Sequence, residues 1–579
     1  MDRRRFAKGL SFIAIGLLIC ACGVTLHPNF QRDPTELFVE TQSQTEWLQW
    51  TESSWAKVPL NYSKPEGDSA AIALIRLRAN ASTHSTEYRG PILVNPGGPG
   101  ASGVDFVRGR GALLAKVVGP QFDIIGFDPR GVARSTPRVS FYESRVEREL
   151  WARSSMKELN MSSDTVATSW ARTKVTGELV AQRDRNVLAH INTDHTARDM
   201  LTTNEALGRE KLQYWGFSYG STLGSTFAAM FPDKVERLVI DGVPDVTDDY
   251  YGAQWKMNLL DTDNVLQWFF KDCLNAGPKD CAFYEPSVEA MSSKLNNLYA
   301  SIIQSPIPVH TNISYGIVDY AHLRITIFRA FFKPFNMWAK LATGLTDLIN
   351  GNGTALYSIF DAGLFQCSCD PLENAFEAVE DAELAISCND GDVVPSDLES
   401  AQEHYASLLK ISEWGSLWAG NRLDCASWPD IPKSQFRGPI AGNTSFPLLI
   451  IGNKADPVTP LWAAHKVSKG FPGSVVLSQD SAGHASISAP SVCTARVIRE
   501  YFMNGTLPDV GTWCSIDGSP FDPSNASSNR QLKLAQDDAQ TPLKHKSWGA
   551  DGEEVSLAQA LRYLATFDYT RVSPLPLHV

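Results

Sequence analysis

The stretch that decides the fold is Gly216-Phe217-Ser218-Tyr219-Gly220, a G-x-S-x-G pentapeptide. Residues 211–215 before it read as a short strand, and residues 221–231 after it are the small and apolar residues of a buried helix. A sharp strand-to-helix turn exposes the serine hydroxyl, and only glycine fits beside it without a clash. The pattern predicts that Ser218 is a nucleophile. The alternative is a glycine-flanked serine in a tight structural turn.

An acid and a histidine follow Ser218 in the chain order that such a nucleophile requires. Asp456 lies in a turn directly after an apolar strand predicted over residues 446–452, and His484 follows the strand predicted over residues 473–478. We therefore expect His484 to be the base and Asp456 the acid that orients it, with Asp480 as the competing acid. The other histidines after Asp456 lie in a helical pattern with lysines or in the polar tail: His465, His545 and His578.

Acyl transfer also needs hydrogen-bond donors aimed at the developing oxyanion. The backbone N–H of Tyr219, next to the nucleophile, predicts one donor. The second is expected from the loop of residues 95–103, which is rich in glycine and proline and follows a predicted strand. Gly98 is the preferred donor and Gly97 the second choice. A phosphate-binding loop is disfavoured because no Gly-Lys-Ser/Thr ending follows and the glycine spacing differs.

Three long motifs resemble the α/β-hydrolases of the prolyl and tripeptidyl aminopeptidase branch. They are residues 95–103 (NPGGPGASG), 122–131 (FDIIGFDPRG) and 214–221 (YWGFSYGS), and residues 447–514 are similar to the carboxy-terminal domain of tripeptidyl aminopeptidase-like members. Residues 58–62 resemble the first strand of that family, although Asn61 replaces a more usual aspartate. Ser221 likewise stands where threonine is more common. The likeness covers residues 45–245 and 385–515.

The resemblance implies a fold, a site and an activity. The fold is an α/β-hydrolase, with a mostly parallel sheet, helices on both faces and a large, mainly helical cap insertion. The family's serine, acid and histidine carry over onto Ser218, Asp456 and His484, the residues already chosen. The implied activity is cleavage of acyl bonds through an acyl-enzyme, releasing short peptides or residues from peptide amino termini.

The order of predicted elements agrees with this fold. Strands are expected over residues 70–77, 92–94, 122–127, 212–215 and 235–240, and helices over 163–189 and 195–207. Such alternation predicts a mostly parallel sheet. The expected units are a core part (45–245), a cap (246–440), a second core part (441–520) and a polar tail (521–579) with a short helix over 557–567. Most of the many aromatic residues of the cap are expected to pack, and a few to line the substrate cleft.

The sequence is compatible with more than one substrate class. A free amino terminus needs an acidic partner, and the cap offers several acids that equally fit a solvated helix face: Glu377, Glu380, Asp381, Glu383 and Asp390. An esterase or hydrolase acting on a small-molecule or secondary-metabolite ester or amide is the alternative. A non-catalytic binding protein on the same fold is disfavoured by the complete set of Ser218, Asp456 and His484.

Composition excludes several partners. The chain has 579 residues, 43% of them hydrophobic, and a net charge of −12. Basic stretches with interleaved aromatics are missing from the sequence, so we expect no nucleic-acid partner. Paired C-x-x-C or H-E-x-x-H motifs are also missing, so we expect neither a metal nor a cofactor. The expected partner is a peptide or a small acyl substrate.

The amino terminus has the features of a targeting segment. A basic region with three arginines precedes an apolar stretch over residues 10–26, shorter than the ~20 residues that a membrane span needs. We expect residues 1–26 to be a signal peptide cleaved after Gly23, which predicts a secreted protein. A retained signal anchor, and then membrane attachment, is the alternative, and a lipid-modified Cys22 is a third. Sequons for N-glycosylation support the secretory route: Asn61, Asn80, Asn160, Asn312, Asn352, Asn443, Asn504 and Asn525.

Cysteine usage also fits an oxidising compartment. We expect three disulfides, with buried free thiols as the alternative for each pair: Cys273 with Cys281, Cys388 with Cys425, and Cys493 with Cys514. Cys367 and Cys369 are left over, and a bond between such close neighbours would be strained. Another connectivity is therefore left open.

Overall fold

A twisted sheet lies at the centre of the part of the chain that the structure describes. The structure is a computed structural model, and it describes residues 51–153, 158–160, 162–183, 185–312, 314–360, 379–432, 436–522 and 550–566. Within these residues, nine strands form one sheet in the order β1-β2-β4-β3-β5-β6-β9-β10-β11. The strands are β1 (Thr51–Pro59), β2 (Ser69–Leu77), β3 (Gly90–Asn95), β4 (Phe122–Phe127), β5 (Leu212–Phe217), β6 (Val235–Asp241), β9 (Leu449–Ala455), β10 (Val475–Ala482) and β11 (Trp513–Cys514).

The sheet is mostly parallel, as predicted. Strands β1 and β2 pair antiparallel, and β2 pairs antiparallel with β4. From β4 to β11 every neighbouring pair is parallel. In parallel strands of this kind the carboxyl ends lie at one edge, where ligand sites form. The ends of β3, β5, β6, β9 and β10 therefore meet at that edge.

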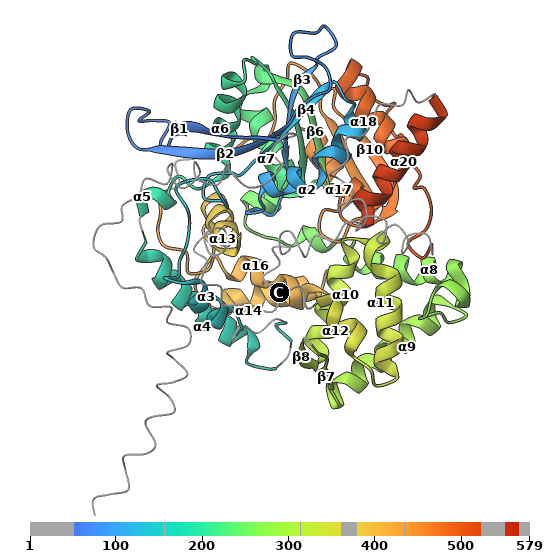
Figure 1. The fold of residues 1–579 in the computed structure, drawn as a ribbon. Coiled ribbons are helices and arrows are strands. Elements are labelled where there is room, and N and C mark those ends of the chain that lie inside the picture. The colour runs from blue at the N-terminus through green and yellow to red at the C-terminus, as the bar shows by residue number, and fades with distance from the viewer. Residues whose placement is uncertain are drawn as a thin grey trace, which may run out of the picture.

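Helices cover the two faces of the sheet and also form a separate helical half (Figure 1). Their bounds are α2 (Gly103–Val118), α3 (Arg145–Arg153), α4 (Thr165–Ala181), α5 (Arg185–Leu188), α6 (Thr193–Ala206), α7 (Tyr219–Met230), α8 (Thr262–Asp280), α9 (Val288–Gln304), α10 (Tyr320–Phe331), α11 (Pro334–Ile349), α12 (Thr354–Phe360), α13 (Val379–Asp390), α14 (Leu398–Leu409), α15 (Gly415–Trp418), α16 (Gly420–Leu423), α17 (Leu461–Ser468), α18 (Val492–Asn504) and α20 (Ala550–Thr566). Short helical turns are η4 (Pro232–Lys234), η5 (Val246–Tyr251), η6 (Met257–Leu259) and η8 (Ser486–Ser488).

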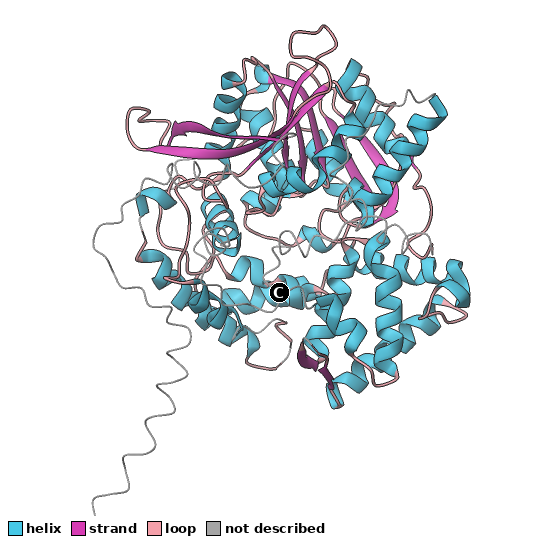
Figure 2. Cartoon of the chain, viewed as in Figure 1, coloured by secondary structure: helices cyan, strands magenta, loops and turns pink. Residues whose placement is uncertain are grey.

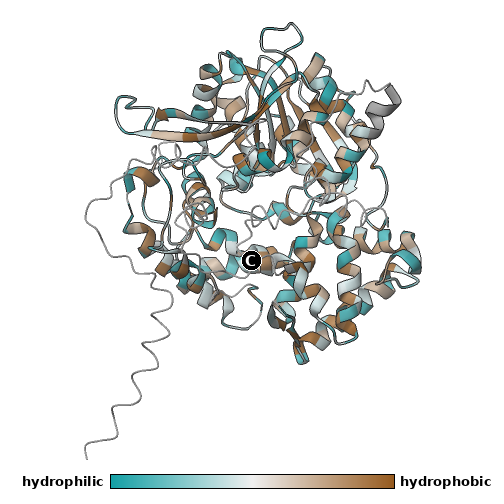
Figure 3. Cartoon of the chain, in the orientation of Figure 1, coloured by the Kyte–Doolittle hydropathy of each residue, from teal (hydrophilic) through white to brown (hydrophobic). Residues whose placement is uncertain are grey.

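Alternating side chains of the central strands supply two separate cores. In β5, Tyr214 packs on one face with Leu223 of α7, whereas Trp215 packs on the other with Leu561 of α20. Successive side chains of a strand point to opposite faces, so a strand covered on both sides is apolar throughout. All six residues of β5 are buried. Figure 3 shows the apolar residues concentrated in these strands and in the helix faces that cover them.

Most helices of residues 246–440 form the other half of the molecule (Figure 2), whereas α13 packs with the core of the sheet. Their own core is rich in buried aromatics, including Phe269, Phe328, Trp338 and Trp414, each fully buried. A small hairpin of β7 (Ile307–His310) and β8 (Tyr315–Val318) belongs to the same half. Helix α4, which precedes β5 in the chain, packs against α14 and α16, so the segment between β4 and β5 also contributes to this half.

Three local expectations differ from the structure. The helix expected over residues 163–189 is two helices, α4 and α5, because the chain turns tightly after Ala181, with Gln182 N–H bonded to the Leu179 carbonyl. The first strand ends at Pro59, because the Leu60 N–H already bonds to the Asp68 carbonyl in the following turn. The carboxy-terminal helix is longer than expected and begins at Ala550.

All three expected disulfides are present in the structure. Cys273–Cys281 lies within the helical half, Cys388–Cys425 joins α13 to the segment after α16, and Cys493–Cys514 joins α18 to β11. Cys367, Cys369, Glu377, Asn525, His545 and His578 lie outside the described residues. So does the apolar segment 10–26, and the described helices include none with the length and apolarity to cross a bilayer. Glycosylation of the sequons stays a prediction.

Candidate active site

Ser218 lies on the turn between β5 and α7. Its backbone has φ 57° and ψ −122°, a positive φ that non-glycine residues rarely adopt. The turn is crowded: a Cβ on Gly216 would lie 2.3 Å from the Gly220 carbonyl oxygen, and one on Gly220 would lie 2.7 Å from the Asn95 carbonyl oxygen. Only glycine fits at both positions. The serine itself remains partly exposed at the carboxyl edge of the sheet, as a nucleophile requires.

Asp456 and His484 lie in direct contact at the same edge. His484 Nδ1 is 2.9 Å from Asp456 Oδ1 and 3.0 Å from Oδ2. Asp456 is fully buried, and its Oδ1 also accepts hydrogen bonds from the N–H groups of Val458 (3.0 Å) and Thr459 (2.8 Å). Its Oδ2 accepts from the N–H of Ala485 (2.9 Å). The carboxylate therefore holds both the imidazole and the backbone around it.

These contacts set the charge of the acid. Burial alone would raise the pKa of Asp456, but His484 and the backbone N–H groups outweigh burial and lower it below its ordinary value. Asp456 is thus ionised at neutral pH, as an acid that orients a histidine must be. The competing acid, Asp480, is half-exposed and forms an ion pair with Lys454 at 3.0 Å. His465 is exposed on α17.

The glycine loop expected to stabilise an oxyanion lies directly against the serine turn. A Cβ on Gly97 would be 2.8 Å from Ser218 Cβ and 3.2 Å from the Tyr219 backbone nitrogen. The Gly97 N–H itself bonds to Asn95 Oδ1 at 2.9 Å, which engages this group within the loop. Gly98 has φ 108°. Gly98 and Tyr219 as the two donors stay a prediction.

Two residues that tie the site together were not singled out from the sequence. Asp241, the last residue of β6, accepts the Ser218 N–H on its carbonyl oxygen (2.9 Å). Its carboxylate accepts the N–H (2.8 Å) and Oγ–H (2.5 Å) of Ser486. Asn453 of β9 donates its side-chain amide to the carbonyls of Gly483 (2.7 Å) and Ala485 (2.8 Å), on either side of the histidine. Both are polar residues near the carboxyl ends of buried strands, which is the signal that would have found them.

The acids expected in the cap differ in their surroundings. Asp390 is buried and accepts from the Thr193 N–H (2.9 Å), the Thr193 hydroxyl (2.5 Å) and the Tyr250 hydroxyl (2.8 Å). Burial raises the pKa of Asp390 to about 6. Asp381 accepts from the Phe141 N–H at 2.9 Å. Glu383 lies against the glycine loop, since a Cβ on Gly100 would be 3.2 Å from its backbone nitrogen.

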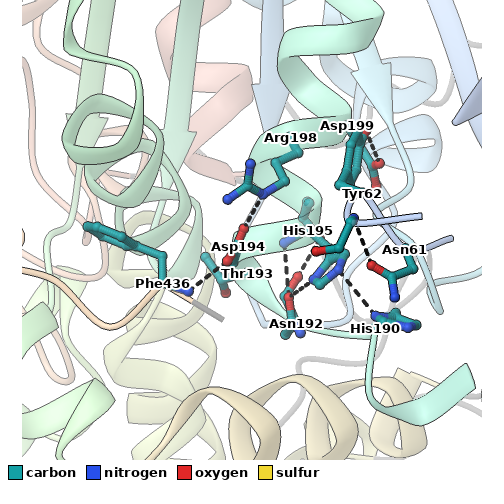
Figure 4. Close-up of polar contacts among 12 residues, drawn as sticks. Asn61, Tyr62, His190, Asn192, Thr193, Asp194, His195, Arg198, Asp199 and Phe436 are labelled. Atoms are coloured by element: carbon teal, nitrogen blue, oxygen red, sulfur yellow. Dashed lines mark hydrogen bonds and ion pairs between the residues drawn. The ribbon is translucent and has the colours of Figure 1, made fainter. Parts of the chain in front are cut away.

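A buried polar network surrounds the amino terminus of α6 (Figure 4). His195 Nδ1 lies 2.9 Å from Asn192 Oδ1, and its Nε2 lies 3.2 Å from His190 Nδ1. Burial, with the nearby cations, lowers the pKa of His195 to about 2. The neutral tautomer with hydrogen on Nδ1 satisfies both contacts. Arg130 and Asp199 form a buried ion pair beside it at 2.6 Å. The sequence predicts no catalytic role for the residues of this network. We therefore assign the network a structural role.

The described residues contain no group of three or more His, Cys, Asp or Glu side chains arranged to hold a metal ion.

Comparison with known families identifies the fold. Residues 90–321 match the family model described as alpha/beta hydrolase fold, and residues 410–514 match that described as TAP-like protein. The chain is an α/β-hydrolase of the tripeptidyl aminopeptidase branch.

Curated relatives of this α/β-hydrolase include serine hydrolases and peptidases. It is 29% identical to serine protease Hip1 of Mycobacterium tuberculosis over 475 residues, covering 79% of this chain and 86% of the relative. It is 27% identical to the tripeptidyl aminopeptidase of Streptomyces lividans, with 80% and 84% of the two chains covered. It is 26% identical to carboxylesterase B of Mycobacterium tuberculosis, with 79% and 85% covered. The α/β-hydrolase is therefore a member of a serine hydrolase and peptidase family.

Proposed function

We propose that the protein is a secreted aminopeptidase that releases short peptides or single residues through an acyl-enzyme, with Ser218, His484 and Asp456 as its catalytic residues. The observation that carries the proposal is the buried Asp456 carboxylate 2.9 Å from His484 Nδ1, on the sheet edge where Ser218 sits on its strained turn. The peptidases among its relatives support peptides as the substrate class.

The proposed reaction follows from these positions. His484 Nε2 takes the proton of the Ser218 hydroxyl as Oγ attacks the carbonyl carbon, and Asp456 stabilises the charged imidazole. The N–H groups of Tyr219 and Gly98 bind the oxyanion of the tetrahedral intermediate. The intermediate collapses with transfer of the proton from His484 to the leaving amine, which leaves an acyl-enzyme. Water then attacks the ester, His484 takes its proton, and the released acid leaves Ser218 protonated again.

Replacement of the nucleophile tests the proposal. Ser218→Ala should abolish turnover of an activated acyl ester and labelling by a fluorophosphonate, with unchanged thermal unfolding. Ser225→Ala is the matched control, because this buried serine on α7 has no hydrogen-bonding partner among the described residues. Undiminished turnover by purified Ser218→Ala would reject the proposal.

Recognition of the free amino terminus is assigned to Glu383 in this proposal. The position of Glu383 supports this assignment, because its backbone adjoins the glycine loop that lies beside Ser218. A charge-assisted hydrogen bond contributes about 1.5–3 kcal/mol, which is about 10- to 100-fold in kcat/KM. Glu383→Gln should lose this factor on peptide amides with a free amine and keep its activity on their N-acetylated forms. Equal losses on both substrates would reject the assignment, and Glu380→Gln is the control.

An esterase or hydrolase acting on a small-molecule ester or amide is the second candidate. The similarity to a carboxylesterase B supports it. Side-by-side measurement of kcat/KM on tripeptidyl amides and on simple acyl esters separates the two. Activity confined to esters would establish the second candidate and reject the aminopeptidase.

Secretion is supported by the three disulfides, which form in oxidising compartments. Cleavage of the amino-terminal segment is expected after Gly23. Sequencing of the mature amino terminus checks this prediction, and a protein that starts at residue 1 in the membrane fraction would favour the retained anchor.

A further inference from the structure

The loop that carries His484 contacts the helical half of the molecule as well as the sheet. The His484 N–H donates to the carbonyl of Phe332, at 3.1 Å. Phe332 lies immediately after α10, in the link to α11. Its ring approaches the imidazole of His484 edge-on, with ring centroids 5.2 Å apart and an interplanar angle of 73°. Phe332 therefore touches the histidine through both its backbone and its side chain.

The two residues after Phe332 continue this contact. A Cβ on Gly483 would lie 2.7 Å from Pro334 Cδ, so the loop passes directly over Pro334. The amine of Lys333 interacts electrostatically with Arg110, Asp241 and Asp456. Phe332, Lys333 and Pro334 are all buried. We call residues 332–334 the α10–α11 link.

The link is itself held in place by the carboxy-terminal helix. Phe335, the next residue, forms a small cluster with Ala489 of the histidine loop and Ala565 of α20. Helix α20 also packs on α11 and on η8, the turn that follows the histidine. The link thus belongs to a packed seam between the helical half and the sheet and is not an exposed edge of a lid.

The two sides of the histidine loop are fixed by different parts of the chain. The Asn453 side chain of the sheet holds the carbonyls of Gly483 and Ala485, while Phe332 of the helical half accepts the His484 N–H and packs against its imidazole. The packing of the Phe332 ring against the imidazole limits rotation of the imidazole about its own side-chain bonds. The contact with Asp456 fixes only the Nδ1 side of the imidazole ring.

We propose that Phe332 is a positioning residue, through which the inserted helical half orients the catalytic histidine. This inference rests on the proposed function, because it assumes that His484 is the base. Reactive groups displaced by about 1 Å can lose about 100-fold in rate, so loss of the ring contact should lower kcat. Substrate binding should change little, because the ring of Phe332 packs on the base and on the aromatic core of the helical half.

The test compares substitutions at two neighbouring phenylalanines of the same helix end. Phe332→Leu removes the ring next to His484, and Phe332→Met refills the space with a flexible side chain. Phe331→Leu is the matched control, because Phe331 is fully buried and its ring packs on Trp414, with ring centroids 4.9 Å apart. We expect kcat to fall about 10- to 100-fold for both Phe332 variants at an almost unchanged KM. Phe331→Leu should lower the Tm yet retain kcat.

A second measurement separates positioning from general destabilisation. The proton between His484 Nδ1 and Asp456 gives a downfield NMR resonance, which should shift or broaden in Phe332→Leu and keep its position in Phe331→Leu. An unchanged resonance, or a kcat loss no larger than that of Phe331→Leu, would overturn the positioning role. Full activity of Ser218→Ala would instead reject the proposed function itself, so the two failures are distinguishable.

Discussion

Substitution of Asp456 by asparagine examines the acid–histidine pair most directly. Both carboxylate oxygens accept backbone N–H groups: Oδ1 from Val458 and Thr459, and Oδ2 from Ala485. Whichever way an asparagine amide turns, its NH₂ faces an N–H donor. One buried donor (Ala485 N–H) or two (Val458 and Thr459 N–H) are then left without an acceptor, at a cost of about 1–3 kcal/mol in stability for each.

The effect on catalysis should be larger than the effect on folding. The carboxylate accepts a hydrogen bond from the His484 Nδ1–H, which in the proposed reaction leaves Nε2 free to take the serine proton. An amide NH₂ opposite Nδ1 favours the other tautomer, with hydrogen on Nε2, and loss of the correct tautomer in a serine triad costs about 10⁴-fold in kcat. This factor corresponds to about 5 kcal/mol of transition-state stabilisation.

The assay is turnover of an activated acyl ester at neutral pH, with urea unfolding measured on the same samples. Asp480→Asn is the matched control, because Asp480 is 48% exposed and its ion pair with Lys454 lies on the surface. Such pairs contribute under about 1 kcal/mol. The reasoning is refuted if Asp456→Asn keeps more than about a tenth of the wild-type kcat, or if Asp480→Asn loses as much.

Three further predictions concern the loop, the buried histidine and a disulfide. Gly97→Ala places a Cβ 2.5 Å from the carbonyl oxygen of Phe217, the residue before Ser218, and should lower kcat about 100-fold. Gly351 also has a positive φ but has open space around it, so Gly351→Ala should lower only the stability. Because burial lowers the pKa of His195 to about 2, the folded state stays neutral while the unfolded state gains a proton below its ordinary value of 6.5, so stability falls with acidification. This one histidine should lower the free energy of unfolding of the wild type by about 1.4 kcal/mol per pH unit as the pH falls from about 6.5 to 5. The urea midpoint of His195→Gln should therefore fall less steeply over this range than that of the wild type; an equal slope would contradict this. Removal of Cys388–Cys425, which closes a separation of 37 residues, should cost about 4 kcal/mol of unfolding free energy by the loop-entropy relation, measured by denaturant titration of the double serine variant.

The strand-to-helix turn, the parallel order of the sheet and the Asp456–His484 pair could all be predicted from the sequence. Each leaves a local mark: glycines at a crowded turn, apolar runs with polar ends, and an acid and a histidine in a fixed order after the serine. The turn at Ser218 is decided by contacts within a few residues and by one neighbouring strand, so short-range patterns suffice.

Asp241, Asn453 and Phe332 could not be singled out in this way. Asp241 and Asn453 stand at strand ends like many other polar residues, and only the sheet order brings both beside the histidine loop. Phe332 is one of many aromatic residues in the helical half, and neighbouring Phe328 and Phe331 simply pack in its core. Which of the three reaches His484 depends on how the two halves meet, and no periodicity in the chain reports that.

Asp241 has a mechanical consequence for the site. Its carbonyl oxygen accepts the Ser218 N–H, and its carboxylate holds the turn that follows His484. Ser218 and the loop of His484, the proposed nucleophile and base, are thus both held by a single residue at the end of β6. We therefore expect a displacement of β6 to carry the serine and the histidine loop together, because each is hydrogen-bonded to the same residue of that strand.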